Sequence, residues 1–189
     1  MKKINIEEIK SIKQPVYVLI AGAIGAGKSF VVSKYLNGIE VIDPDEITKV
    51  LGNGEYISTN VAQSMAITKE TVTTKLKDGK SFIQQGTSAN LQSSINKMKQ
   101  AKANGFTTVM LFVDTPISQA VVNVSNRSDR NIISPRKIER TANGAKHTFD
   151  FMSEQPVTEG ANIILENMNI TVEAAQALTD YTVHYKNIQ

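Results

Sequence analysis

One segment, residues 16–30, restricts the fold of this chain more than any other. It begins with the apolar run Val-Tyr-Val-Leu-Ile-Ala, which is typical of a buried parallel strand. Residues 22–29 follow directly and match the pattern G-x-x-x-x-G-K-S/T of a phosphate-binding loop. Gly22, Gly25 and Gly27 allow backbone conformations that a Cβ atom would block, so successive N–H groups can converge on phosphate oxygens. The segment therefore predicts a strand, a phosphate-binding loop and a helix, in that order.

The predicted loop defines a nucleotide site. In such loops the lysine, here Lys28, reaches the β- and γ-phosphates, and the hydroxyl of Ser29 is a ligand of Mg²⁺. We therefore expect ATP and Mg²⁺ as cofactors. The expected nucleotide contacts are Gly22, Ala23, Ile24, Gly25, Ala26, Gly27, Lys28, Ser29 and Phe30. A glycine-rich turn without a nucleotide is the structural alternative, but the complete motif behind an apolar strand favours nucleotide binding.

Length and composition limit the remaining possibilities. The 189 residues suffice for one α/β domain with a sizeable core, and we expect a single domain over residues 1–189. The chain has no Cys, which excludes a disulfide framework, a Cys-ligated metal site and a thiol nucleophile. It has neither a signal peptide nor an apolar run of about 20 residues, so we expect a soluble cytoplasmic protein. The net charge of +3 permits an anionic substrate, such as a nucleotide or DNA, without requiring one.

Strand and helix patterns alternate along the chain, which predicts a doubly wound α/β fold. We expect a mainly parallel, five-stranded sheet with helices on both faces and an arginine-containing lid. Short apolar runs predict strands in the first half of residues 16–30 and at residues 39–42, 80–84, 106–113 and 161–165. Helix-like patterns are found at residues 1–14, 58–78, 117–125 and 171–184, the second of them with an internal break.

Two carboxylates follow the second predicted strand, at the edge where open parallel sheets bind ligands. Asp43 precedes Pro44 and has two interpretations, as the N-cap of the next helix or as a functional group. Asp45 is the better catalytic candidate, because an acceptor hydroxyl in phosphoryl transfer must be oriented and must lose its proton to a nearby carboxylate. We therefore expect Asp45 to be the general base.

Two further positions stay open on sequence alone. Asp114 follows an apolar strand, as in the Walker B pattern that positions Mg²⁺ in many P-loop enzymes. The following Thr115 and Pro116 explain the same residue as the start of a helix. His147 is expected to be structural or exposed, because phosphoryl transfer needs no imidazole.

Two arginines, Arg127 and Arg130, follow the helix predicted at residues 117–125. They are three residues apart and share a face if the segment is helical or ordered by a ligand. Two guanidinium groups are suited to holding a phosphoryl group during its transfer. A solvated basic surface loop is the alternative. Downstream of a phosphate-binding loop the lid is favoured, and we expect both arginines to be catalytic.

The order of these motifs resembles the zeta-toxin and polynucleotide-kinase group of P-loop kinases. The loop at residues 22–29 is followed by Ile-Asp-Pro-Asp-Glu at residues 42–46 and by arginines behind a later helix. Within that group, residues 82–131 resemble the phage-type hydroxymethyluracil DNA kinases most, with Asn-Gly-Ala-Lys at residues 143–146 in the next helix. The resemblance covers roughly residues 16–170.

The resemblance implies that Asp45 is the general base for the acceptor hydroxyl and that Arg127 and Arg130 contact nucleotide phosphates. Two residues depart from the family pattern. Gln85 stands where an Asp is expected before Gly-Thr, and Asn123 stands where a further Arg is common. Gln85 weakens the case for a second acidic ligand near the metal. Because of both departures, the resemblance alone does not identify the acceptor.

The resulting hypothesis is a kinase that moves the γ-phosphate of ATP to a hydroxyl, with hydroxymethyluracil in phage DNA as the expected acceptor. A nucleotide sugar, UDP-N-acetylglucosamine, and a polynucleotide 5′-hydroxyl are the alternative acceptors. A nucleotide-sensing switch is the non-enzymatic alternative, but a switch has no need of a base for an acceptor hydroxyl. The sequence has no Asn/Thr-Lys-x-Asp motif for reading guanine, which favours ATP over GTP.

Overall fold

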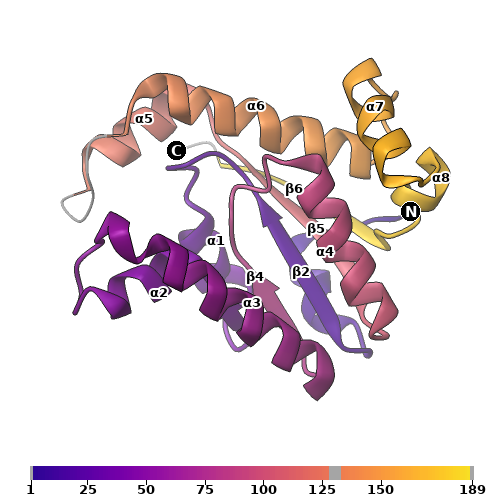
Figure 1. Ribbon diagram of the computed structural model, residues 1–189, viewed down its shortest axis with the longest axis horizontal. Helices are drawn as coiled ribbons and strands as arrows, with labels where there is room; N and C mark the ends of the chain where they lie inside the picture. Colours follow the sequence, from indigo (N-terminus) through magenta and orange to yellow (C-terminus); the bar gives the residue numbers. More distant parts are fainter. Residues whose placement is uncertain (1, 128–132, 188–189) are drawn as a thin grey trace.

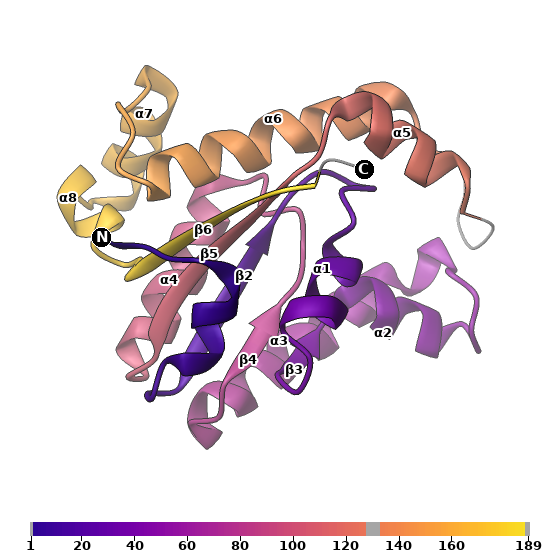
Figure 2. The same ribbon diagram turned by 180° about the vertical axis from the view of Figure 1, so that it is seen from behind.

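A six-stranded parallel sheet forms the centre of the computed structural model, which describes residues 2–127 and 133–187. The strand order is β1-β6-β5-β2-β4-β3, and each pair of neighbours is parallel. Helices cover both faces of the sheet, as Figure 1 and Figure 2 show from opposite sides. The doubly wound α/β class predicted from the sequence is therefore confirmed.

The strands are longest in the middle of the sheet. They are β1 (Lys2–Lys3), β2 (Val16–Ala21), β3 (Glu40–Ile42), β4 (Phe82–Gln84), β5 (Thr107–Asp114) and β6 (Tyr181–Lys186). The helices are α1 (Lys28–Tyr35), α2 (Pro44–Leu51), α3 (Val61–Asp78), α4 (Leu91–Ala103), α5 (Ile117–Ser125), α6 (Pro135–Met152), α7 (Glu159–Met168) and α8 (Val172–Gln176). Two 3₁₀ helices, η1 (Ile6–Ser11) and η2 (Ser58–Asn60), precede β2 and α3. No helix within the described ranges is both long enough and apolar enough to cross a membrane.

The strand β2, which leads into the phosphate-binding loop, is buried along its whole length. Its alternate side chains enter two different hydrophobic clusters. Tyr17 and Leu19 join the cluster formed with α3, α4, α6, α7 and α8, while Val18 and Ile20 join the cluster formed with η1, α1 and α5. Burial on both faces explains why this strand is a continuous apolar run in the sequence. It also fixes the register that delivers the loop to the carboxyl edge of the sheet.

The strand predicted at residues 161–165 is wrong, because this segment lies inside α7. Thr158 caps that helix by accepting a hydrogen bond from the Ala161 N–H. Ala161 and Leu165 are buried while Asn162 and Ile163 are exposed, and burial at positions four apart is helical periodicity. The short apolar run misled the prediction, since such runs occur in both strands and buried helices.

The helix predicted at residues 171–184 is also wrong. Only α8 is helical there, and the chain then returns as β6, which pairs with β5 over all six of its residues. Asp180 fixes the entry into β6, because its Oδ2 accepts a hydrogen bond from the Thr108 N–H (2.8 Å). With β6 and the edge strand β1, the described part of the sheet has six strands instead of the predicted five.

The N-terminal helix predicted over residues 1–14 is replaced by β1 and η1. Ile6 and Ile9 are buried at a spacing of three, which suits a 3₁₀ helix. The helix α3 is continuous over 18 residues, without the predicted internal break. The predictions for residues 39–42, 80–84, 106–113 and 117–125 are confirmed, with ends that differ by no more than the usual uncertainty of boundaries.

Candidate active site

The phosphate-binding loop connects the end of β2 to the first turn of α1. Gly25 and Gly27 have φ of 84° and 83°, in the left-handed region that favours glycine. A Cβ atom on Gly27 would lie 2.9 Å from Nδ2 of Asn187, so a larger residue would push against this side chain, which itself donates to the Ala26 carbonyl. The backbone shape expected from the glycines is therefore present at the N-terminus of α1, where N–H groups favour anions.

Three side chains from distant parts of the sequence hold the carbonyl groups of this loop. Asn123 Nδ2 donates to the Gly25 carbonyl (2.9 Å), and Thr115 Oγ1 (2.8 Å) and Asn187 Nδ2 (3.1 Å) both donate to the Ala26 carbonyl. Because the C=O and N–H of a trans peptide point in opposite directions, these contacts turn the next N–H away from them. Neither Thr115 nor Asn187 was predicted to support the loop, and Asn123 stood out only as a departure from the family pattern.

Lys28 folds back over the loop. Its Nζ donates hydrogen bonds to the carbonyl groups of Gly22 (3.1 Å) and Ala23 (2.8 Å). These contacts hold the ammonium group against the backbone that precedes α1. A positive charge beside converging backbone N–H groups is an arrangement that binds polyphosphates.

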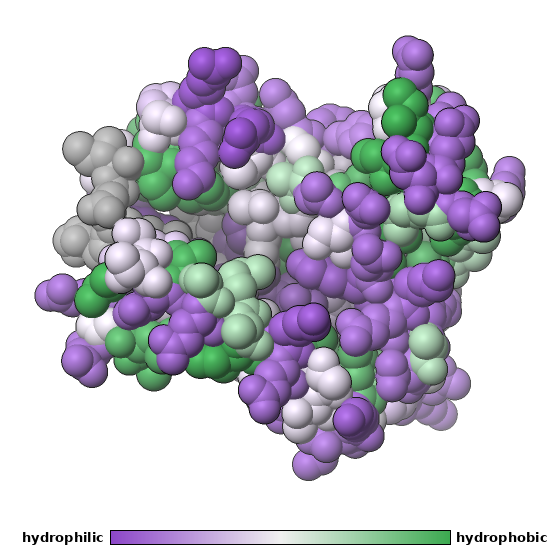
Figure 3. Space-filling view, viewed as in Figure 1, coloured by the Kyte–Doolittle hydropathy of each residue, from purple (hydrophilic) through white to green (hydrophobic). Residues whose placement is uncertain are grey.

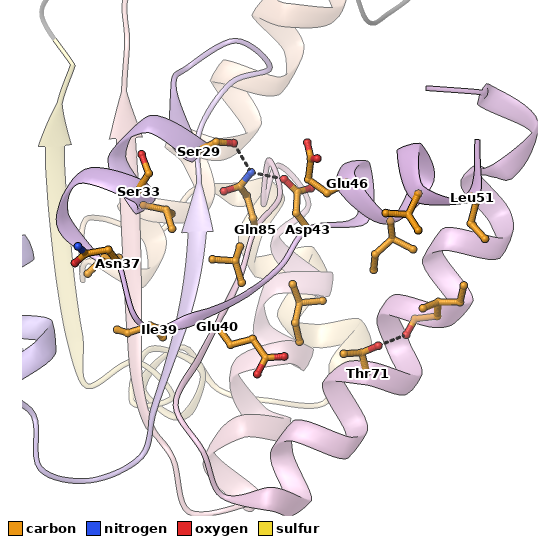
Figure 4. Close-up of a pocket in the computed structure, with 17 residues that line it drawn as sticks. Ser29, Ser33, Asn37, Ile39, Glu40, Asp43, Glu46, Leu51, Thr71 and Gln85 are labelled. Carbon is orange, nitrogen blue, oxygen red and sulfur yellow. Dashed lines mark hydrogen bonds between the residues drawn. The ribbon is translucent and has the colours of Figure 1, made fainter. Parts of the chain in front are cut away.

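Gln85 links the loop to the first carboxylate after β3. Its Nε2 donates to Ser29 Oγ (2.9 Å) and to Asp43 Oδ2, and Figure 4 shows these three side chains in a row. The other oxygen of this carboxylate, Asp43 Oδ1, accepts a hydrogen bond from the Asp45 N–H (2.9 Å) and caps α2, as one interpretation of the sequence predicted. Burial raises the pKa of Asp43, and the negative charges of Asp45 and Glu46 raise it further.

Ser29 and Asp43 offer oxygen atoms of the kind that Mg²⁺ prefers. Proteins commonly hold this ion through one or two oxygen ligands together with the phosphates of a nucleotide. The Ser29 hydroxyl and the half-buried Asp43 carboxylate both contact one amide group, that of Gln85. These residues therefore fit a Mg²⁺–nucleotide site. In such a site, the Gln85 amide would hold the Ser29 hydroxyl and the Asp43 carboxylate together and would not itself be a third protein ligand.

A cavity of about 320 Å³, here called the loop cavity, lies over the phosphate-binding loop. Its walls include residues 24–29, Asp43, Asp45 and the exposed Arg127. The structure thus brings most of the residues predicted for phosphoryl transfer to one space. Arg130 lies outside the described residues.

A second cavity, of about 910 Å³ and here called the inter-helix cavity, adjoins the first. Asp43, Asp45 and residues 85–87 line both of them. The inter-helix cavity extends between α3, α4 and the start of α6, and Figure 3 shows the surface hollowed between the α5–α6 side and the α2–α3 side. Its volume is in the range of ligand pockets, about 300 to 1,000 Å³. Asp45 therefore lies where a polyphosphate site meets a space for a second ligand.

A third cavity, of about 750 Å³, lies beside the row formed by Ser29, Gln85 and Asp43 (Figure 4). Apolar side chains of α1, α2 and α3 and of the edge strand β3 form most of its lining, with Leu36 and Val50 among them. Lys28, Asp45 and Arg127 are not part of that lining, so this cavity is distinct from the space in which the predicted catalytic groups meet.

Asp114 and His147 line neither the loop cavity nor the inter-helix cavity. The Asp114 Oδ2 is 2.8 Å from His184 Nε2, and α5 begins only after Pro116. The metal role considered for Asp114 therefore stays a prediction. His147 is half-buried with Nε2 2.9 Å from Thr158 Oγ1, at the start of α7, which agrees with the expected structural role.

A parallel sheet with a phosphate-binding loop after the central strand β2, and carboxylates after β3, which is separated from β2 by β4, is the arrangement of the class of P-loop kinase folds. Within that class, the chain belongs to the Zeta toxin family, whose model matches residues 3–177. No curated protein sequence matches the chain.

Three solved structures share this fold. One is from the PezAT chromosomal toxin–antitoxin system of Streptococcus pneumoniae, at 15% identity and a TM-score of 0.59, covering 98% of this chain and 71% of that one. The AvrRxo1-ORF1:-ORF2 complex with ATP gives 16% identity and a TM-score of 0.62, and the match covers 79% of this chain and 54% of that one. A protein from Chloroflexus aurantiacus gives 18% identity and a TM-score of 0.55, covering 69% and 76%. This chain therefore spans about half of the AvrRxo1 chain that it matches.

Proposed function

We propose that this protein is an ATP-dependent kinase that transfers the γ-phosphoryl group to a hydroxyl. The observation that carries this proposal is the position of Asp45, which lines both the loop cavity and the inter-helix cavity. A carboxylate between a polyphosphate site and a ligand-sized pocket is placed to accept the proton of a bound hydroxyl. A nucleotide-sensing switch would need neither this base nor the second pocket.

In the proposed reaction, the acceptor oxygen forms a bond to the γ-phosphorus while the bond from that phosphorus to the bridging oxygen of ADP breaks. Asp45 takes the proton of the hydroxyl. Lys28 and the backbone N–H groups of the loop orient the phosphates, and Arg127 and Arg130 stabilise the charge on the transferring group. Ser29 and Asp43 would hold Mg²⁺, whose charge would offset that of the phosphates.

Asp43 is suited to a supporting role in this site. One of its oxygens caps α2 and the other accepts a hydrogen bond from Gln85. A carboxylate with both oxygens engaged is held in place, which suits a structural or metal-binding role.

We propose hydroxymethyluracil in phage DNA, in the cytoplasm of the host cell, as the acceptor. The target nucleotide would have to leave the duplex stack, at a cost of a few kcal/mol, and an inter-helix cavity of about 910 Å³ has room for one base. The exposed lysines Lys69 and Lys137 line this cavity and could contact DNA phosphates. The net charge of +3 also favours a polyanionic partner.

UDP-N-acetylglucosamine is a second candidate acceptor. Membership in the Zeta toxin family supports it, and so does a pocket of small-molecule size. A polynucleotide 5′-hydroxyl is a further alternative in the same reaction class.

Transfer of radiolabelled γ-phosphate from ATP tests these proposals directly. The acceptors to compare are DNA with hydroxymethyluracil, ordinary thymine DNA with a free 5′-hydroxyl, and UDP-N-acetylglucosamine. We expect label on the hydroxymethyluracil base alone. Label on a DNA end, or only on the nucleotide sugar, would replace the proposed acceptor. Failure to label any of the three, by a protein that binds ATP, would contradict the kinase proposal.

A further inference from the structure

One lysine of the inter-helix cavity, Lys97, is half-buried and has no charged partner among the described residues. Lys97 lines this cavity together with Ser93 and Gln100, which precede and follow it on α4 by four and three residues. This spacing places the three side chains in one polar stripe along the helix. Within residues 2–127 and 133–187, no hydrogen bond or ion pair engages the ammonium group of Lys97.

Burial makes this unpaired charge unfavourable. Removal from water lowers the pKa of Lys97, because the charged form loses hydration without gaining a partner. The neighbouring lysines of α4 differ, since Lys99 is exposed and Lys102 pairs with Asp180. A half-buried cation without a counter-ion is a recognised sign of a ligand site.

Two more lysines reach the same cavity from other helices, Lys69 from α3 and Lys137 from the start of α6. Neither ammonium group forms an ion pair with any carboxylate among the described residues. None of the three lysines lines the loop cavity, whereas the acids Asp43 and Asp45 line both cavities. The inter-helix cavity is therefore acidic where it meets the loop cavity and basic farther from it.

We propose that Lys97 binds a phosphate group of the acceptor, so that this kinase acts on a phosphate-bearing nucleotide whose hydroxyl lies near Asp45. A phosphate supplies several acceptor oxygens and up to two negative charges, which suits one half-buried lysine with two exposed ones around it. Both a nucleotide sugar and a flipped DNA nucleotide carry such a group. The role in catalysis rests on the proposed kinase function, but the anion site itself does not.

Binding of inorganic pyrophosphate to the full chain tests this site without requiring turnover. The protein is first saturated with Mg²⁺ and a non-hydrolysable ATP analogue, so that the phosphate-binding loop is filled, and pyrophosphate is then titrated by calorimetry. We expect Lys97→Met to weaken pyrophosphate binding by about 10- to 100-fold, as for the loss of a charge-assisted hydrogen bond. Lys97→Arg should keep most of the affinity because it keeps the charge.

The matched control is Lys99→Met, which removes an exposed charge from the same helix and should bind pyrophosphate like the unaltered protein. Lys97→Met should also retain the affinity for the ATP analogue and unfold at the same or a higher temperature, because it removes a buried unpaired charge. Equal pyrophosphate binding by Lys97→Met and the unaltered protein would overturn the proposal. So would the absence of pyrophosphate binding by the unaltered protein.

Competition identifies the source of the phosphate. UDP-N-acetylglucosamine and an oligonucleotide with hydroxymethyluracil are each added to the pyrophosphate complex, and displacement by either one supports the proposal. If pyrophosphate binding depends on Lys97 but neither competitor displaces it, the anion site stands and both proposed acceptors fail. In the transfer assay, Lys97→Met should raise the KM for the acceptor by about 10-fold or more and leave the KM for ATP unchanged.

Discussion

At the residue scale, Lys28 is proposed to matter for phosphoryl transfer and little for folding. Its ammonium group donates to the carbonyl groups of Gly22 and Ala23, and the side chain belongs to neither hydrophobic cluster. We expect Lys28→Ala to reduce phosphoryl transfer by about 10³-fold or more, because a principal electrostatic contact to the transferring group is lost. The thermal unfolding midpoint should change little. Lys99→Ala, an exposed lysine outside both cavities, is the control, and near-normal turnover by folded Lys28→Ala would contradict the role of the loop.

The two carboxylates at the start of α2 can be separated by isosteric changes. Asp45→Asn should keep ATP binding and lose about 10² to 10⁴-fold in transfer, as expected for a general base. Asp43→Asn keeps an N-capping side chain but removes a charge proposed to hold Mg²⁺.

Activity measured against Mg²⁺ concentration distinguishes these roles. High Mg²⁺ should restore much of the activity of Asp43→Asn and none of that of Asp45→Asn. The reverse result would show that the base is Asp43.

At the residue scale, the sequence predicts which side chains can do chemistry better than it predicts which ones support them. The loop motif and Asp45 follow from residue type and spacing, because each stands next to a recognisable strand or helix signal. Thr115, Asn123 and Asn187 could not be predicted to hold the loop, because a side chain that donates to a backbone carbonyl far along the chain has no local pattern.

The support given by Thr115 can be measured. It is buried, and its hydroxyl is one of two donors to the Ala26 carbonyl. Thr115→Val keeps the shape and removes the donor, which should cost about 0.5 to 1.5 kcal/mol of loop stabilisation and weaken ATP binding by about 2- to 10-fold. Thr73→Val on α3 is the control, since that exposed hydroxyl bonds only within its own helix. Unchanged ATP affinity in Thr115→Val would show that the loop does not need the hydroxyl of Thr115, with Asn187 as the remaining donor to the Ala26 carbonyl.

At the element scale, prediction succeeded where a segment has one apolar pattern and failed where two are possible. The strands β2 and β5 are buried on both faces and read as continuous apolar runs. The strand β6 alternates polar and apolar residues, and its partner β5 lies about 70 residues earlier in the chain, so no local signal identifies the pairing. The segment of α7 contains a short apolar run that fits a strand as well as a helix. Only its N-cap and its pattern of burial in the structure identify it as a helix.

The segment that follows α5 is proposed as a lid over the nucleotide. Arg127 lines the loop cavity although its side chain is exposed, which suits a group that contacts a bound phosphate. Arg127→Ala and Arg130→Ala should each lower kcat by about 10²-fold, and the lysine variants should recover only part of it because lysine lacks the planar fork. Arg136→Ala, exposed in the first turn of α6, is the control. Full activity in both single variants and in the double variant would return the segment to a simple surface loop.

At the scale of the whole molecule, the active site is a product of topology. The strand order places β4 beside β2 and β3 beyond β4, so that the loop after β2, the carboxylates after β3 and Gln85 after β4 meet at one edge of the sheet. The rule that ligands bind at the carboxyl edge of parallel strands predicted that Asp43 and Asp45 lie at this edge, whereas the contacts of Gln85 with Ser29 and Asp43 were not predicted. The inter-helix cavity could not be predicted, because it depends on how α3, α4 and α6 are spaced above that edge.

The nature of the acceptor leads to the last prediction, which concerns the charge of the molecule as a whole. If DNA is the acceptor, binding releases counter-ions, and log K falls linearly with log salt with a slope of about −0.9 per phosphate neutralised. Contacts by Lys69, Lys97 and Lys137 would give a slope of about −2 to −3 for DNA with hydroxymethyluracil. Lys137→Met should make the slope of log K against log salt less negative by about 1. Lys99→Met, outside the cavity, should leave this slope unchanged.

Titration of a fluorescent oligonucleotide at several salt concentrations measures these slopes. Thymine DNA should show the same electrostatic slope with weaker binding, because it offers phosphates but no hydroxyl to place near Asp45. A slope close to zero, together with tight binding of UDP-N-acetylglucosamine, would show that the lysines of the inter-helix cavity serve a small diphosphate instead of a DNA strand. The three lysines would then contact a single ligand, whose affinity should be reduced by each lysine-to-methionine change and most by Lys97→Met, since Lys97 is the one withdrawn from water.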